Sequence, residues 1–402
     1  MSATYRWIAA CCAWLALLLV PGAAEAGGPF FVRSDGLPFV WSTAAPIAYR
    51  TDNGPLSATI DEANATTRVN SMFAVWDAVP TAAIRYARAG FINAVGAFSG
   101  GDVDTAAEYD AVSGDCDAGN QSPVVYDVDA TIFIDLGYDE TSVIGFAGPC
   151  TANATQFLTG LVVMNGLFQD GARAPVLDLT AAKFDAALIH EIGHFSGLDH
   201  SQINVNCLAG CVANDLDGLR TMFPFLLDDS QAQLSPDDIA WISRLYPQTV
   251  GGTTFANTHG TISGIVFFSD GESHAQLVNV IARQVGQDRR IAVSVASGFK
   301  FRVFHGNPIN DPSGTSPGSE APGDIGLFEI PVPAGNYTIS VESINDLFVD
   351  GSSVGSQILR IAMPGTAPPA IGPISVAAGS TVSGNNVTLI GTAPRFDQFE
   401  GP

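Results

Sequence analysis

Apolar residues recur at helical spacing in the middle of the chain, over residues 180–196. Intervals of three or four residues place such side chains on one face of a helix, where they can pack on a core. The residues that follow this pattern are Phe184, Leu188, Ile192 and Phe195. Thr180, or Asp178 just before it, can cap the start with a side-chain oxygen. We therefore predict an amphipathic helix that ends at Gly197.

The residues before this helix show both strand and helix patterns. Residues 39–51 carry apolar side chains at strand spacing and predict a first strand. Ser57 can cap a helix that runs to about Asp77. Further strands are predicted at residues 83–87, 130–136, 143–147 and 160–165. Residues 90–121 are rich in Gly, Asp and Ala and are expected to form a long loop.

The pattern changes after a Gly- and Thr-rich stretch at residues 249–259, which we interpret as an interdomain linker. Beyond it, short strands with Gly, Pro and Asn in their turns are typical of an all-β sandwich. They are predicted at residues 261–267, 276–284, 326–331 and 333–341, with the last ones in residues 374–389. His259, His274 and His305 share no ligand spacing, so we predict that they are surface residues.

The end of the central helix carries the pattern H-E-x-x-H-x-x-G-x-x-H. His190 and His194 are four residues apart, so a helix places both imidazoles on one face, where they can bind one zinc ion. Gly197 can adopt the left-handed conformation that ends a helix, and the turn after it lets His200 supply a third nitrogen. Three protein ligands leave a fourth position open, as in catalytic zinc sites. Glu191 is then placed to act as general base toward a water at the metal.

The same residues also fit a simpler interpretation, in which a buried amphipathic helix carries histidines that are satisfied core residues. That interpretation requires five specified positions to coincide by chance. We therefore prefer the zinc site.

The eleven-residue motif resembles that of the metzincin clan of zinc endopeptidases. Residues 221–224, Thr-Met-Phe-Pro, look like the methionine turn of that clan, with Met222 as its methionine. Ser201, directly after the third histidine, is similar to the matrixin branch. So are residues 234–239 and the helix expected around residues 242–246. The resemblance covers roughly residues 38–247.

The resemblance implies an α+β metzincin catalytic domain, with a mixed twisted sheet, an active-site helix and a closing helix, that cleaves protein or peptide substrates. It also implies that an edge strand, at residues 143–147 or 160–165, binds the substrate as an added strand. Two features depart from the matrixins: 21 residues separate His200 from Met222, and no tyrosine follows Pro224 to wall a specificity pocket.

The C-terminal half resembles the transthyretin-like regulatory domain of carboxypeptidases, through its G-x-I-x-G-x-V and P-A-G-x-Y-T-I-x-V segments. This resemblance implies a role in folding, in substrate docking or in attachment to a surface or polymer, and the fold alone does not choose among them. It also supports a second hypothesis, a non-catalytic exported binding or adhesion protein that uses the C-terminal β-sandwich. Degenerate peptidases usually lose the glutamate or a ligand, whereas this chain keeps all four, so we prefer the peptidase.

The net charge of −23, from 40 acidic and 17 basic residues, excludes nucleic acid and anionic membrane surfaces as expected partners. Several carboxylates in the predicted long loop could instead bind calcium: Asp102, Asp104, Asp115 and Asp117. A solvated acidic loop is the more common outcome, and we prefer it.

Residues 1–26 resemble a secretory signal peptide, with Arg6, a 14-residue apolar run and an Ala-Glu-Ala cleavage site. No later segment is long and apolar enough to span a bilayer. We therefore expect a secreted protein, extracellular or periplasmic, without a membrane span in the mature chain. Its predicted parts are the signal peptide, a peptidase domain at residues 27–248, the linker at residues 249–259 and a β-sandwich at residues 260–402.

Four cysteines remain after removal of the signal peptide, an even number that favours disulfides in an exported protein. Three pairings are open. We favour Cys116 with Cys150 and Cys207 with Cys211. A cysteine metal site is the alternative, but the sequence contains no C-x-x-C pair.

Overall fold

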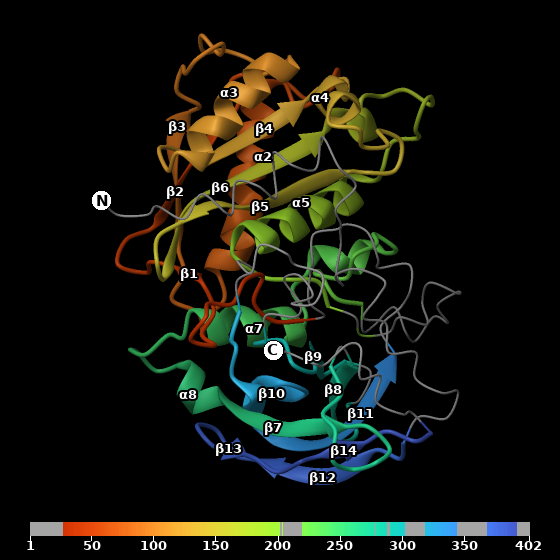
Figure 1. The fold of residues 1–402 in the computed structure, drawn as a ribbon. Coiled ribbons are helices and arrows are strands. Elements are labelled where there is room, and N and C mark those ends of the chain that lie inside the picture. The colour runs from red at the N-terminus through yellow and green to blue at the C-terminus, as the bar shows by residue number, and fades with distance from the viewer. Residues whose placement is uncertain are drawn as a thin grey trace.

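The computed structural model describes residues 27–201, 203, 219–276, 278–287, 290–301, 318–343 and 368–391. Its N-terminal part, in the upper half of Figure 1, is built around a six-stranded mixed sheet. The strands are β1 (Val40–Trp41), β2 (Ile47–Thr51), β3 (Tyr86–Phe91), β4 (Pro123–Asp127), β5 (Gly145–Ala152) and β6 (Gln156–Asn165). Four of them run parallel in the order β3-β2-β4-β6, and β1 runs parallel to the start of β6. β5 is antiparallel to β6.

Helices cover both faces of this sheet, which explains why β4 and β6 are nearly continuous apolar runs. The helices are α2 (Glu62–Asp77), α3 (Ala106–Asp117), α4 (Thr131–Asp135), the 3-10 helix η1 (Gly166–Gln169) and α5 (Ala181–Phe195). Successive side chains of a strand point to opposite faces. Val124 and Val162 accordingly join the core with α2 and α5, whereas Val125 and Val163 join a second core with α3 and α4. α5 is thus fixed on one face of the sheet.

The helix expected to start after Ser57 begins instead at Glu62, so this part of the prediction is wrong. Its N-cap is Asp61, whose carboxylate accepts the backbone N–H of Asn64. Ser57 lies in the preceding turn, and its hydroxyl donates to the carbonyl of Gln169. Gln169 is 112 residues away in the sequence. Because the Ser57 hydroxyl bonds to it, that hydroxyl does not cap the helix.

The strand predicted at residues 130–136 is also wrong, because these residues form α4. A short apolar run fits a buried strand and a buried helix equally well. Here Ala130 adopts a left-handed conformation (φ 62°), and the Asp127 carboxylate accepts the N–H of Phe133. Both features start a helical turn that buries Ile132 and Phe133 against the sheet.

The loop predicted at residues 90–121 contains α3, which Thr105 caps by accepting the N–H of Glu108. The pattern analysis missed α3 because Tyr109, Val112 and Cys116 are its only buried residues, spaced by three and four positions in a polar stretch. Three strands lie partly outside their predicted bounds, β3, β5 and β6, and β4 was not predicted.

The C-terminal part consists of two four-stranded sheets. Its strands are β7 (His259–Phe267), β8 (Val278–Gln284), β9 (Ala292–Ala296), β10 (Leu327–Pro333), β11 (Gly335–Ser343), β12 (Ile371–Val376), β13 (Thr381–Val382) and β14 (Val387–Thr388). One sheet has the order β10-β7-β13, with β14 also on β7, and the other has the order β12-β11-β8-β9. Their apolar side chains join one cluster, which is continuous with the core under α5.

Helix α7 (Pro236–Leu245) lies between the two parts (Figure 1). A capping box starts it: Ser235 accepts the N–H of Asp238, and the Asp238 carboxylate accepts the N–H of Ser235. The 3-10 helix η3 (Asp229–Ala232) precedes it. Trp241 and Leu245 of α7 are buried in the shared core. A helix therefore occupies the residues where a closing helix was expected, and β9 and β10 of the C-terminal sheets pack against it.

The segment interpreted as a linker holds a helical turn, α8 (Phe255–Thr258), and β7 begins at His259. The ring of Phe255 stacks on the imidazole of His259, with centroids 5.0 Å apart. His259 is only 6% exposed, and its burial lowers its pKa to about 4. The prediction that His259 is a surface residue is therefore wrong, because α8 covers it. His274 is partly exposed, and His305 lies outside the described residues.

A disulfide joins Cys116 of α3 to Cys150 of β5, as predicted. It fixes the edge strand β5 to the helical layer above the sheet. Cys207 and Cys211 lie outside the described residues, and so do residues 1–26. No helix in the described part of the chain is long and apolar enough to cross a bilayer.

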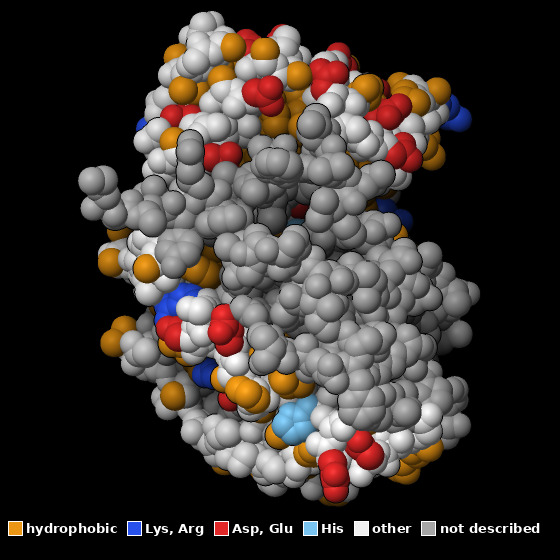
Figure 2. Space-filling model, in the orientation of Figure 1, with side chains coloured by type: hydrophobic (Ala, Val, Ile, Leu, Met, Phe, Trp, Pro, Cys, Tyr) orange, Lys and Arg blue, Asp and Glu red, His pale blue; other side chains and the backbone are white. Residues whose placement is uncertain are grey.

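Acidic side chains are spread over the described upper and lower parts of the face in Figure 2, with few Lys and Arg side chains among them. This distribution follows from the 40 acidic and 17 basic residues of the sequence. Negative charge is therefore distributed over both parts of the molecule.

One pair of carboxyl groups is buried beside β4. Asp52 is fully buried, and burial together with the charge of Asp102 raises its pKa to about 7. Asp102 is partly buried, and its pKa is raised to about 6, chiefly by burial. The folded chain therefore binds more protons than the unfolded chain between about pH 4 and 7. Stability is expected to fall as the pH rises through this window.

Replacing Asp102 by Asn removes one of the two charges. We expect the free energy of unfolding to rise by about 1–2 kcal/mol at pH 8, where both carboxyls are ionised, and to change little at pH 4.5. Urea unfolding at the two pH values measures this difference. Asp135→Asn, on the exposed side of α4, is the matched control. An equal gain in both variants would contradict the assignment to the buried pair.

Candidate metal centre

The helix that carries the histidine motif starts and ends as the sequence predicts. The Thr180 hydroxyl accepts the N–H of Lys183, so Thr180 and not Asp178 is the N-cap. Gly197 has φ +88°, and its N–H bonds to the carbonyl of His194. A Cβ at this position would lie 2.8 Å from the ring of Phe157. Glycine is therefore required both by the backbone conformation and by the close packing.

The turn after Gly197 brings three imidazoles together. The Nε2 atoms of His190 and His194 each lie 3.0 Å from Nε2 of His200. Two nitrogens bound to one zinc ion at about 2.0–2.1 Å in tetrahedral geometry lie roughly 3.3 Å apart, close to the spacing found here. Among the described residues, the side chains of His190, His194 and His200 form a group that could share one metal ion.

Backbone carbonyls fix the orientation of two of the rings. Nδ1 of His190 lies 2.7 Å from the carbonyl of Thr221, and Nδ1 of His194 lies 2.9 Å from the carbonyl of Leu198. Because a carbonyl can only accept a hydrogen bond, each Nδ1 carries a proton and each Nε2 presents a lone pair. Nε2 of His200 lies 3.0 Å from both of these nitrogens, so one cation could bind all three. The donor set thus fits a metal ion, and zinc favours neutral imidazole ligands.

The electrostatic environment keeps these imidazoles neutral. Burial lowers the pKa of His190. Burial, together with repulsion from a protonated His190, lowers the pKa of His194 to about 3. For His200, burial and the two other imidazoles lower the pKa strongly. Neutral imidazole is the form that binds a metal, so the ligands need no deprotonation at neutral pH.

Glu191 directly follows His190 on α5 and is 7% exposed. Burial raises the pKa of its carboxyl to about 8. Gly145, the first residue of β5, packs directly against it: a Cβ there would lie 3.0 Å from Cγ of Glu191. The Gly145 end of the edge strand β5 therefore packs against Glu191.

Met222 packs against α5 between the first two histidines of the motif. A Cβ on Gly193 of α5 would overlap the Met222 sulfur, so the two residues are in direct contact. The Asp238 carboxylate accepts the N–H groups of Thr221 and Met222, both at 3.1 Å. Asp238 thereby holds the turn whose Thr221 carbonyl orients His190. Sequence reasoning had named Met222 but missed these roles of Asp238 and Thr221.

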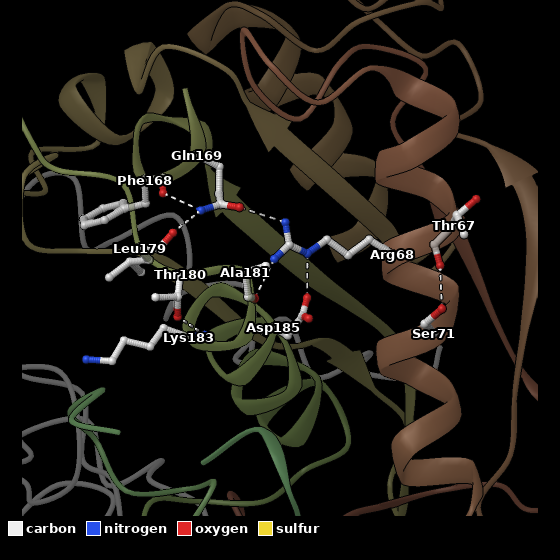
Figure 3. A network of polar contacts seen from close by, with 10 residues as sticks. All are labelled: Thr67, Arg68, Ser71, Phe168, Gln169, Leu179, Thr180, Ala181, Lys183 and Asp185. Carbon is white, nitrogen blue, oxygen red and sulfur yellow. Dashed lines mark hydrogen bonds and ion pairs between the residues drawn. The ribbon is translucent and has the colours of Figure 1, made fainter. Parts of the chain in front are cut away.

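A polar network holds the start of α5 in place (Figure 3). The guanidinium of Arg68, on α2, donates to the Asp185 carboxylate at 2.6 Å, to the Gln169 amide oxygen at 3.0 Å and to the Ala181 carbonyl at 2.7 Å. It also stacks on the ring of Phe184, 4.8 Å from the centroid. One side chain thus connects α2 and η1 to the first turn of the helix that carries two of the ligands.

Replacing Arg68 by Met removes all three hydrogen bonds and leaves the Asp185 carboxylate without this cation. We expect the free energy of unfolding to fall by about 1.5–3 kcal/mol, as for hydrogen bonds to charged groups. Urea unfolding followed by circular dichroism measures the change. Lys183→Met is the matched control, because Lys183 is on α5, the helix that the network holds, and its side chain points away from Arg68 in Figure 3. Equal losses in the two variants would contradict a role for the network.

The predicted site residues therefore fall into two groups. His190, His194 and His200 lie together, Glu191 and Gly197 lie on and at the end of the same helix, and Met222 packs against Gly193 of that helix. The carboxylates considered for calcium do not assemble with one another: Asp102 and Asp104 precede α3, while Asp115 and Asp117 lie at its end. In the described residues they form no metal-binding group with one another.

Comparisons with known proteins add little to this geometry. No family model matches the chain, and no curated protein matches it. Among solved structures, a leucine-rich repeat protein from Bacteroides thetaiotaomicron VPI-5482 matches 35% of this chain and 16% of its own length, at 14% identity and a TM-score of 0.18. A likeness of this size carries no argument about fold or function.

Proposed function

We propose that the chain is a secreted zinc-dependent endopeptidase. The observation that carries this proposal is the convergence of three imidazole nitrogens, two of which present lone pairs, at the end of a helix that also carries the buried carboxyl group of Glu191. His190, His194 and His200 would hold the ion, and Glu191 would act as the base. The resemblance of the motif to the metzincins supports the same assignment.

A zinc ion at this position supplies a Lewis acid, which polarises a peptide carbonyl and makes water more acidic. The residues of the chain perform the proton transfers. The Glu191 carboxylate takes a proton from water and then gives it to the nitrogen of the leaving amine. The raised pKa of Glu191 suits a group that must both accept and release a proton near neutral pH.

The edge strand β5 is the proposed binding surface for the substrate backbone. Among the described strands it pairs with β6 alone, so its other edge is free to bind an extended peptide by main-chain hydrogen bonds. Its Gly145 end lies against Glu191, which brings such a peptide to the base. Of the two segments that the sequence left open, β6 has partners on both sides and β5 does not.

The test pairs metal analysis with hydrolysis of casein by the purified chain. We expect one zinc ion per chain, hydrolysis that a chelator abolishes, and recovery of hydrolysis on addition of zinc. Inhibitors of serine and cysteine peptidases serve as the control and should leave the rate unchanged. A freshly purified chain without zinc would contradict the proposal. Zinc without hydrolysis of casein or of a peptide library would favour a non-catalytic binding protein.

A further inference from the structure

The outer edge of β9 does not face solvent. β9 pairs with β8 on one side, and its other side packs against α7 and the residue that precedes the Met222 turn. The N–H of Ser294 donates to the Asp237 carboxylate at 2.8 Å, and the carbonyl of Ser294 accepts the indole N–H of Trp241 at 2.8 Å. The guanidinium of Arg220 donates to the carbonyl of Ala292 at 3.2 Å. Side chains of the N-terminal part thus occupy the hydrogen-bonding positions that a further strand would take.

The groups on β9 connect directly to the turn that carries the third histidine. Ser201 follows His200, and its hydroxyl bonds to the Asp237 carboxylate and lies 3.5 Å from the Ser294 hydroxyl. The N–H of Ser201 donates to the carbonyl of Met222 at 2.7 Å. Any shift of Ser294 relative to α7 therefore acts on the residue next to His200.

A second connection leads to His190. Asp238 follows Asp237 on α7 and binds the N–H groups of Thr221 and Met222. The carbonyl of Thr221 accepts the Nδ1 proton of His190. The position of α7, which β9 holds through Asp237 and Trp241, therefore sets the orientation of a second imidazole.

The N-terminal segment fills the space between β9 and the same turn. The N–H of Gly27 donates to the carbonyl of His200, and a side chain on Gly27 would overlap the carbonyl of Ser294. The N–H of Asp199 donates to the carbonyl of Gly28 at 3.1 Å. The turn is thus enclosed on two sides, by residues 27–28 and by the edge of β9.

We propose that the outer edge of β9 is a positioning element for the metal ligands. The C-terminal sheets then serve the metal centre itself, through Ser294, Asp237 and Trp241, and are not merely a separate docking module. The inference rests on the proposed metal site but not on peptide hydrolysis. Its tests therefore read metal binding.

The experiment uses the full-length chain, freed of metal and then loaded with cobalt(II) or zinc. Trp241→Phe removes the indole donor to Ser294, and Asp237→Ala removes the acceptor. We expect both variants to shift the cobalt absorption spectrum and to raise the zinc dissociation constant about three- to tenfold, measured against a chromophoric chelator. Asp237→Asn retains an oxygen acceptor for Ser294, and its spectrum and affinity should match those of the wild type.

Tyr337→Phe is the matched control. It removes one hydroxyl donor, to the carbonyl of Pro333 at 2.7 Å, within the C-terminal sheets and away from the edge of β9. It should lower the free energy of unfolding without changing the spectrum or the zinc affinity. Trp241→Phe and Asp237→Ala variants that lose stability but bind metal like the wild type would overturn the inference.

Two further outcomes are decisive. If Trp241→Phe and Asp237→Ala do not fold, Ser201→Ala replaces them, because it removes only the hydroxyl between Asp237 and Ser294. A shifted cobalt spectrum and a raised zinc dissociation constant in Ser201→Ala would then support the inference, and wild-type values would overturn it. A wild-type chain that binds neither zinc nor cobalt overturns this inference together with the proposed function. A chain that binds zinc but cleaves no peptide overturns the proposed function, while the effect of Trp241→Phe on metal binding still decides this inference.

Discussion

Replacing Glu191 by Gln is expected to reduce casein hydrolysis by about 10²–10⁴-fold while one zinc ion per chain is retained. Glutamine has the shape of the protonated carboxyl but cannot accept a proton from water. Glu191 is 7% exposed, and Gly145 of β5 packs against its Cγ, so a side chain of equal size should fit without moving the helix. The rings of His190 and His194 keep their hydrogen bonds to backbone carbonyls, because neither bond involves Glu191.

The rate constant and the zinc content of Glu191→Gln are measured on the same preparation. Glu272→Gln makes the same chemical change at an exposed position of the C-terminal part and should leave both quantities at wild-type values. Hydrolysis within threefold of the wild type would contradict the role of Glu191 as base. Loss of zinc together with hydrolysis would leave a structural defect as the explanation, and the spectrum of the cobalt-loaded variant identifies such a defect.

The parts of the site that could be predicted from sequence depend on local spacing. His190 and His194 are one helical turn apart, and the apolar pattern from Phe184 to Phe195 predicts that helix and its buried face. Gly197 marks the end of the helix because few other residues adopt a positive φ. The pairing of Cys116 with Cys150 was one of three open choices, and the structure confirms it.

The parts that could not be predicted depend on contacts between distant segments. Ser57 looks like a helix cap, but its hydroxyl bonds to Gln169, and Asp61 takes the capping role. His259 looks like a surface residue until α8 covers it. The apolar run at residues 130–136 has no periodicity that separates strand from helix, and the Asp127 carboxylate decides in favour of α4.

Contacts between distant segments also join the two parts of the chain on either side of residues 249–259, the stretch interpreted as a linker. The edge of β9 binds Asp237, Trp241 and Arg220, three residues that local sequence assigns to the N-terminal part. Because these side chains are buried, separating the two parts would expose a continuous core and leave their polar groups without these partners.

His200→Ala removes the third imidazole and is expected to abolish hydrolysis. Loss of a residue that only hydrogen-bonds to a metal ligand weakens metal binding by up to about a hundredfold, so loss of a ligand itself should weaken zinc binding by more than that. His190 and His194 keep the carbonyl bonds that orient their rings, so the variant should retain a two-nitrogen site of low affinity. Competition with a chromophoric chelator measures the dissociation constant, and casein hydrolysis is followed at saturating zinc. His274→Ala is the matched control, since the Nδ1 of His274 also bonds to a backbone carbonyl, at 2.8 Å, but lies in the C-terminal part. Zinc affinity at the wild-type level in His200→Ala would show that the metal binds elsewhere in the chain, because no arrangement of the two helical imidazoles alone can replace the nitrogen that lies 3.0 Å from both of them.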